Sequence, residues 1–272
     1  MEVDLVFTTL NAGWEITLTT GCAMHIHVST GTTDQDRYTM EHVRRILKAM
    51  ALFDDAITKI MPAHRKDNVW AMSNFQGREA PATLRQEYAA VPTQTWAPLF
   101  NRFDKIRMKQ MVFMEMEQNR SLSWNFSNLA AQCGTVEFRR PPSVRTAAEA
   151  KHWAGVALGF VAQALDTDFN QYIGSSSYLP VNALLAFLDR GIGRLDGTCR
   201  GCLNPAAIKE DRSPPMAYTA VQLKAIARKK AEKNKAGSPF VAKANSRPNT
   251  PSGSPGARSN ASGSSDRSRH QE

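Results

Sequence analysis

Over residues 1–195, the spacing of apolar positions alternates between two residues, as in a strand, and about 3.6 residues, as in a helix. This mixture predicts an α+β domain. Four stretches have the helical period: residues 37–61, which end before Pro62, residues 98–117, residues 147–165, and a short stretch over residues 181–190. Residues 147–165 are apolar on most faces, so this helix is predicted to be well buried.

Three short segments, residues 23–29, 121–128 and 135–140, have the two-residue period of a strand that is apolar on one face and polar on the other. The apolar faces consist of Met24, Ile26, Val28, Leu122, Trp124, Phe126, Val136 and Phe138. The polar faces consist of His25, His27, Ser29, Ser121, Ser123, Asn125, Ser127, Thr135, Glu137 and Arg139. The simplest arrangement is one antiparallel sheet with helices packed on its apolar face and an open polar face.

The polar faces carry chemistry that an ordinary solvated sheet surface lacks. They display two imidazoles, a carboxylate, a guanidinium and an amide rather than the usual Lys, Glu, Gln and Thr. Imidazole and carboxylate are ligands for divalent cations, and a guanidinium is a planar donor for phosphate or carboxylate oxygens. A single His-x-His or Glu-x-Arg is most often structural. Their conjunction on three strands favours nucleotide-phosphate chemistry, in which a protein mainly positions groups and neutralises charge.

The charge of the chain changes this picture only toward the C-terminus. The 272 residues carry a formal charge of +9, of which +7 comes from the ten Lys/Arg and three Asp/Glu after residue 227. We therefore expect a nearly neutral catalytic domain over residues 1–195, a linker over 196–217, a basic helix over 218–235 and a disordered Ser/Gly/Pro/Arg-rich tail over 236–272. The tail is expected to attract acidic partners weakly, without specific nucleic-acid binding.

The sequence shows neither a run of eighteen apolar residues nor a secretory signal. We therefore expect an intracellular protein without a membrane partner, located in the cytoplasm, with a nuclear location also open. The four cysteines are expected to be reduced. Cys199 and Cys202 form a single C-x-x-C that lacks the second ligand pair of a zinc site, and we interpret it as a loop.

Four ordered blocks of the sequence resemble the fungal and bacterial amidoligases, a family similar to glutamine synthetase. GCAMHIHVS resembles their C-G-L-H-V-H-V-G strand, and Pro62, Arg65, Asn68 and Trp70 match a P-x-x-R-x-x-N-x-aromatic segment. WNFSNL and GTVEFRR resemble the L-N-L-x-N-L and G-T-V-E-F-R strands. The blocks lie within residues 21–165 and match the C-terminal catalytic half of such an enzyme.

The resemblance implies an incomplete glutamine synthetase-like half-barrel that uses ATP and Mg²⁺. Such an enzyme joins a carboxylate and an amine, in a small molecule or a peptide, through an acyl phosphate. By resemblance, the metal ligands are His25, His27 and Glu137, the nucleotide contacts are His27, Arg65, Asn125 and Arg139, and the catalytic residues are Arg65 and Arg139. Asn125 would alternatively bind substrate or orient a metal ligand.

The resemblance also predicts an E-x-E metal motif on a strand near the start of the domain. Glu2 and Asp4 have the same i, i+2 spacing and could replace this motif. The alternative that we favour is that residues 1–10 are the end of a helix upstream of the His-x-His strand. In that case the chain is a truncated gene model, an isoform or a degenerate homologue of the family, and its domain, truncated at the N-terminus, would lack some of the magnesium-binding carboxylates.

Three functions stay open at this point. The first is an amidoligase, and the second is a truncated, inactive homologue that acts as a binding or scaffold protein. The third is a metal-dependent hydrolase or cupin-like enzyme with His25 and His27 as ligands, which needs a further His or Asp that the sequence does not offer at a convincing position.

Overall fold

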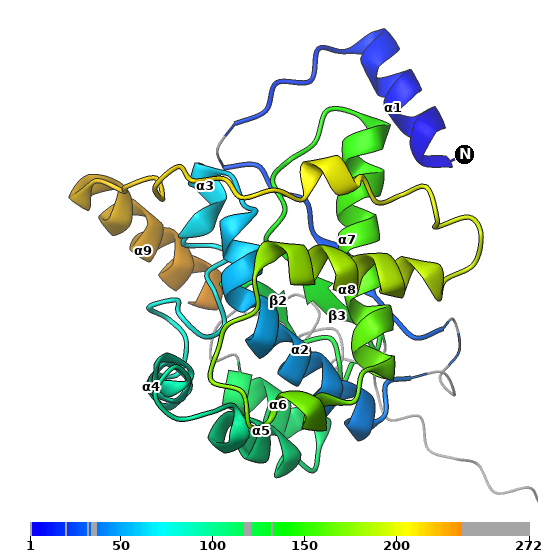
Figure 1. The fold of residues 1–272 in the computed structure, drawn as a ribbon. Helices are drawn as coiled ribbons and strands as arrows, with labels where there is room; N and C mark the ends of the chain where they lie inside the picture. The colour runs from blue at the N-terminus through cyan, green and yellow to red at the C-terminus, as the bar shows by residue number, and fades with distance from the viewer. Residues whose placement is uncertain are drawn as a thin grey trace, which may run out of the picture. The chain divides into compact units, whose positions relative to one another are not determined.

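The computed structural model describes residues 2–19, 21–31, 33, 37–116, 121–131 and 133–235. The chain divides into two compact units, Met1–Ala217 and Tyr218–Glu272. The first unit combines helices with a three-stranded antiparallel sheet (Figure 1), so the predicted α+β class is confirmed. The segment predicted to be a disordered tail, residues 236–272, lies outside the described residues.

The elements follow one another in an order that places the three strands between helices. The helices of the first unit are α1 (Glu2–Gly13), α2 (Met40–Lys59), α3 (Ala63–Lys66), α4 (Ala82–Ala90), α5 (Ala97–Asp104), α6 (Lys109–Met116), α7 (Ala147–Asp166) and α8 (Val181–Gly193), with 3-10 helices η2 (Phe169–Tyr172) and η3 (Pro205–Ala207). The strands are β1 (Ile26–Val28), β2 (Trp124–Asn125) and β3 (Val136–Phe138). The second unit contains α9 (Ala220–Lys235). In the described part of the chain, no helix is long and apolar enough to cross a bilayer.

The sheet has the strand order β1-β3-β2, so the last strand in the chain lies between the other two. Phe138 of β3 pairs with Ile26 of β1 on one side and with Trp124 of β2 on the other. These three apolar side chains are buried, and the rings of Trp124 and Phe138 stack with centroids 4.5 Å apart. The predicted apolar face is therefore the buried face of the sheet.

Helices α2, α7 and α8 form the layer over this face (Figure 1). Phe160 of α7 lies against Trp124, with ring centroids 5.1 Å apart. Phe53 of α2 and Phe187 of α8 both contact Phe160, which joins the three helices into one core. Both long helices, α2 and α7, begin at a threonine capping box, which satisfies backbone N–H groups that a helix N-terminus leaves without partners.

The predicted helix over residues 98–117 is wrong in one respect, because the structure has two helices there, α5 and α6. Arg44 of α2 accounts for the break. Its Nε and Nη2 donate to the carbonyl oxygen of Ile106, at 3.1 and 2.9 Å, and so hold this carbonyl away from helical hydrogen bonding. The buried Ile106 side chain fixes the same turn. Helix α4 has no counterpart in the sequence prediction.

Residues 196–217, for which the sequence predicts a linker, belong to the first unit. Leu203 and Ile208 are buried there, and the N–H of Asp211 donates to the carbonyl oxygen of Lys59 at 2.8 Å. Cys199 and Cys202 are free thiols in a turn of this segment. The apolar residues of this segment are spaced too widely to indicate a helix or a strand. The hydrophobic pattern of the sequence therefore resembles that of a linker.

Candidate active site

The register of the sheet brings predicted site residues from three strands together. His27 of β1 and Asn125 of β2 both pair with Glu137 of the central strand β3. Side chains alternate across a strand, so residues two positions apart share a face. His25 therefore lies on the same face as His27, and Arg139 lies on the same face as Glu137. Five of the six predicted site residues therefore lie on the face of the sheet opposite its apolar core.

Glu137 is the centre of this cluster. Its Oε1 accepts hydrogen bonds from His25 Nδ1 at 2.9 Å and from Arg139 Nη1 at 3.0 Å, and His27 Nε2 lies 3.7 Å from the same oxygen. The side chain of Glu137 is 7% exposed, whereas those of His25 and His27 are 41% and 44% exposed. The carboxylate is thus buried beneath two imidazoles that reach solvent.

The surroundings of Glu137 determine its charge. Burial opposes ionisation, but the hydrogen bond from His25 and the positive charge of Arg139 outweigh burial and hold the pKa of the carboxyl below its ordinary value. Glu137 is therefore a carboxylate at neutral pH. Among the described residues its contacts fall on Oε1, which leaves Oε2 as an acceptor for a ligand.

Two residues that the sequence did not single out complete the cluster. Thr135 Oγ1 lies 3.1 Å from Nδ1 of His27, which fixes the ring and directs its Nε2 toward Glu137. Ser123 of the β2 segment is a neighbour of Arg139, whose N–H donates to the Ser123 carbonyl oxygen at 2.8 Å. Both were visible in the sequence as polar positions, but only the register shows what they contact.

Ser123 and Arg139 each contain a buried polar atom without a partner in the described structure. These atoms are Oγ of Ser123 and Nε of Arg139. By strand alternation both side chains lie on the face that carries Glu137. A buried polar group without a hydrogen bond costs about 1–3 kcal/mol, so two such atoms beside one carboxylate indicate a place where a ligand or ordered water completes the hydrogen bonding.

The predicted open polar face is open only on the side of β1. Ser121, Ser123 and Asn125 are buried, with exposed fractions of 5%, 1% and 2%. The segment that contains Met72 and Asn74 runs along the outer edge of β2 and closes it. Met72 exchanges backbone hydrogen bonds with residues 121 and 123, and the Asn74 side chain bonds both backbone groups of Trp124.

Asn125 is held by its own turn. Its Oδ1 accepts from the backbone N–H of Ser127 at 2.7 Å and from the Ser127 hydroxyl at 2.6 Å. The oxygen is therefore occupied by local structure. The role of Asn125 in binding nucleotide or substrate stays a prediction, and its contacts favour a structural role in the turn after β2.

Arg65 is the predicted site residue that the structure does not bring into the cluster. It lies on α3, is 2% exposed, and donates from Nε to the carbonyl oxygen of Arg140 at 2.9 Å and from Nη2 to that of Arg139 at 2.7 Å. Arg65 therefore holds the end of β3 in place. Its predicted contact with phosphate is not supported by these bonds and stays a prediction.

A buried ionic network behind the sheet was missed by the sequence analysis. Arg140 is fully buried, donates from Nη2 to the carbonyl oxygen of Lys66 at 2.9 Å, and lies 3.7 Å from Asp54 Oδ1. Asp54 Oδ2 accepts from Ser73 and Gln76 at 2.6 and 2.9 Å. Burial raises the pKa of the Asp54 carboxyl although Arg140 opposes this, and burial lowers the pKa of Arg140. The signal in the sequence was an aspartate inside an otherwise apolar helical stripe.

The N-terminal segment is helical, as the favoured alternative predicts. Glu2 and Asp4 belong to α1, and Asp4 forms an ion pair with Lys151 of α7 at 2.5 Å. The alternative that they replace the E-x-E motif of a strand is therefore wrong. Over residues 2–235, masked positions excepted, no group of three or more His, Cys, Asp or Glu side chains is arranged to hold a metal ion. The metal-ligand roles of His25, His27 and Glu137 stay predictions.

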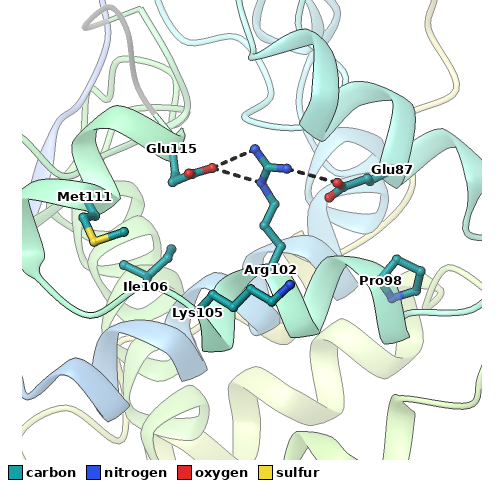
Figure 2. A pocket seen from close by; sticks show the side chains of 7 residues that line it. All are labelled: Glu87, Pro98, Arg102, Lys105, Ile106, Met111 and Glu115. Carbon is teal, nitrogen blue, oxygen red and sulfur yellow. Dashed lines mark hydrogen bonds and ion pairs between the residues drawn. The ribbon is translucent and has the colours of Figure 1, made fainter.

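A separate pocket of about 300 Å³ lies between α4, α5 and α6 (Figure 2). Figure 2 shows Arg102 at its centre, between Glu87 and Glu115. Arg102 donates to Glu87 Oε1 and Glu115 Oε2, both at 3.0 Å, and to the hydroxyl of Thr83 at 3.2 Å. Two carboxylates neutralise the guanidinium, so it joins three helices rather than binding an anion. None of the predicted site residues lines this pocket.

A known protein family matches much of the chain. Residues 3–161 match the model of the family described as "Putative amidoligase enzyme", which is more than half of the chain. The chain therefore belongs to this amidoligase family. The match includes α1 and all three strands of the sheet. No curated protein and no solved structure gives a match.

Proposed function

We propose that this protein is an ATP-dependent amidoligase whose active site is the polar face of the sheet around Glu137. In the proposed reaction a substrate carboxylate oxygen attacks the γ-phosphorus of ATP, which gives an acyl phosphate and ADP. An amine then attacks the acyl carbon, phosphate leaves with the electrons of the C–O bond, and the amine loses a proton to give the amide. The observation that carries the proposal is the convergence of His25, His27 and Arg139 on one buried carboxylate.

The side chains of Glu137, His25 and His27 are of types that bind divalent cations. Mg²⁺ is usually held by one or two protein carboxylates, with phosphate oxygens and water in its other positions. Glu137 would supply Oε2, and His25 and His27 would supply imidazole nitrogens from the exposed side of the cluster. Such a cation would neutralise charge on the phosphate oxygens during transfer.

The chain's own residues would bind and orient the phosphates. Arg139 has a mostly buried guanidinium whose Nε has no hydrogen-bond partner in the described structure. Oγ of the neighbouring Ser123 is also buried and has no partner there. Both could donate to a phosphate or carboxylate oxygen, which makes a charge-assisted hydrogen bond in the case of Arg139. Thr135 would keep His27 in its orientation.

A binding protein without catalytic activity is the second candidate. The observation that favours it is that Glu137 is the one carboxylate of the described cluster, since Glu2 and Asp4 lie on a helix. With fewer carboxylates the site would hold a cation weakly, and nucleotide binding could persist without turnover.

Isothermal titration calorimetry on the full chain tests the proposal. We expect ATP binding that requires Mg²⁺ and that weakens at least ~10-fold in Glu137→Gln and in His25→Ala. The matched control is Asp189→Asn, which converts an exposed carboxylate on α8 to an amide. Thermal unfolding of each variant shows that it is folded.

Three outcomes separate the possibilities. Absence of Mg-ATP binding by the folded wild-type chain would contradict the proposal. Binding that is lost in the two site variants, together with phosphate release that depends on added carboxylate and amine, would support the ligase. The same binding without phosphate release under any substrate mixture would support the second candidate instead.

A further inference from the structure

Helix α9 is the most basic element that the structure describes. Its sixteen residues include Lys or Arg at positions 224, 228, 229, 230, 233 and 235 and a single acidic residue, Glu232. Lys224 and Lys229 are exposed. Arg228 pairs with Glu232 at 2.9 Å, which neutralises one charge of each sign. The helix therefore presents at least the positive charges of Lys224 and Lys229 to solvent.

These charges are distributed around the helix rather than along one side. Because successive residues turn by about 100°, Lys224 and Arg228 lie on one face, while Lys229 and Lys230 point to two others. The apolar residues are few, and Val221, the most exposed of them, is 79% exposed. An interfacial membrane helix needs a continuous apolar face with large side chains, and α9 has neither this face nor an aromatic residue.

We propose that α9 binds the phosphate backbone of nucleic acid without sequence specificity. A helix of sixteen residues is ~24 Å long, which matches the length of about seven base pairs of duplex. A duplex has phosphates at regular spacing on every side, so cations placed around a helix can neutralise several of them. The chain that follows adds five Lys/Arg against two Asp/Glu over residues 236–272, which continues the same charge.

The composition of α9 also argues against an acidic protein as its partner. A protein interface relies on buried apolar or aromatic side chains for most of its affinity. The described residues of α9 offer Leu223 and Ile226 as half-buried apolar side chains and many alanines. Phosphate contacts need only exposed cations, which the helix has. This inference does not depend on the ligase activity of the first unit.

Fluorescence anisotropy of the full chain with a labelled 20-base-pair DNA duplex and a labelled 20-nucleotide RNA tests the proposal. We expect both probes to bind, and log affinity to fall linearly with log salt, by about 0.9 per phosphate contact on the duplex. The variant Lys224→Gln/Lys229→Gln should reduce this slope by about 2. At 0.1 M salt its affinity for the duplex should be lower by roughly 50-fold, since each contact contributes a factor of ~8 there.

The control is Arg85→Gln/Lys209→Gln, which removes the same charge from two exposed positions of the first unit. It should keep the slope and affinity of the wild type. An equal loss in both double variants would overturn the proposal, because it would assign binding to net charge. Tighter binding to phosphatidylserine vesicles than to either nucleic acid at equal salt would overturn it in favour of a membrane surface.

Discussion

The crossing of α7 and α8 depends on two glycines, and this dependence can be tested. Gly159 of α7 and Gly191 of α8 face each other, and a Cβ added at Gly191 would overlap the carbonyl oxygen of Gly159 and lie 2.6 Å from its carbonyl carbon. The obstacle is helix backbone, which cannot rotate away. Ordinary contact begins near 3.4 Å, so Gly191→Ala would force the helices apart by more than ~1 Å. Protein interiors are densely packed and do not absorb such a shift freely.

The expected change follows from two opposing effects. Alanine favours a helix over glycine by ~1 kcal/mol, whereas overpacking of this kind costs ~1–3 kcal/mol or more, and loosens the contact of Phe160 with Phe187. We expect Gly191→Ala to lower the free energy of unfolding by ~1–2 kcal/mol, which corresponds to a Tm about 2–8 °C lower for a unit of this size. Urea and thermal unfolding, followed by circular dichroism at 222 nm, measure both.

The control is Gly193→Ala at the end of the same helix, where an added Cβ meets nothing within 4 Å. This variant should be as stable as the wild type or slightly more stable. If Gly191→Ala unfolds at the same urea concentration as Gly193→Ala, the two helices do not cross as closely as described, and the packing argument fails.

Three further predictions concern Arg65, His152 and Thr135. Arg65→Met should lower the free energy of unfolding by ~2–4 kcal/mol, because it leaves one buried and one partly buried carbonyl oxygen without this donor. A loss of ATP binding at unchanged stability would instead support the catalytic role. His152, as a neutral imidazole, accepts a hydrogen bond from the N–H of Asn204 at 3.1 Å, and burial lowers the pKa of His152. The contribution of this residue to stability should therefore be complete above pH ~6.5 and fall as the pH decreases below that value. Urea unfolding of His152→Asn should show a weaker dependence of stability on pH. Thr135→Val frees Nδ1 of His27 and should weaken Mg-ATP binding ~10-fold with little change in Tm, as calorimetry would show.

The faces of the strands could be predicted from the sequence because side-chain alternation is a local property. The apolar positions 26, 124 and 138 are buried and the imidazoles at 25 and 27 face the other way, as the pattern predicts. The pairing of strands is not local. The sequence could not show that Glu137 lies between His27 and Asn125, because this follows from the strand order β1-β3-β2.

The remaining differences have the same origin in long-range contacts. The pattern of residues 98–117 is helical throughout, and the break in it is made by Arg44, which is more than fifty positions away. Arg65 matches a family motif in sequence, yet its guanidinium is used by carbonyl groups about seventy-five residues later. A buried arginine and a catalytic arginine are indistinguishable until their partners are known.

The two sides of the polar face impose different requirements on a ligand. On the β1 side, His25 and His27 are nearly half exposed and already contact Glu137, so a cation must compete with these contacts or use Oε2. On the β2 side, Ser123 Oγ and Arg139 Nε are buried and have no partner in the described structure, so an oxygen-rich group gains hydrogen bonds there without breaking any. Under the proposed function, a phosphate oxygen that reaches these two atoms would gain hydrogen bonds there, with its cation toward the imidazoles. If this face were only structural, Val in place of Ser123 would be more stable, because it would remove the free-energy cost of the buried hydroxyl. Retention of ATP affinity in Ser123→Val, with a gain in stability, would show that no ligand uses this hydroxyl.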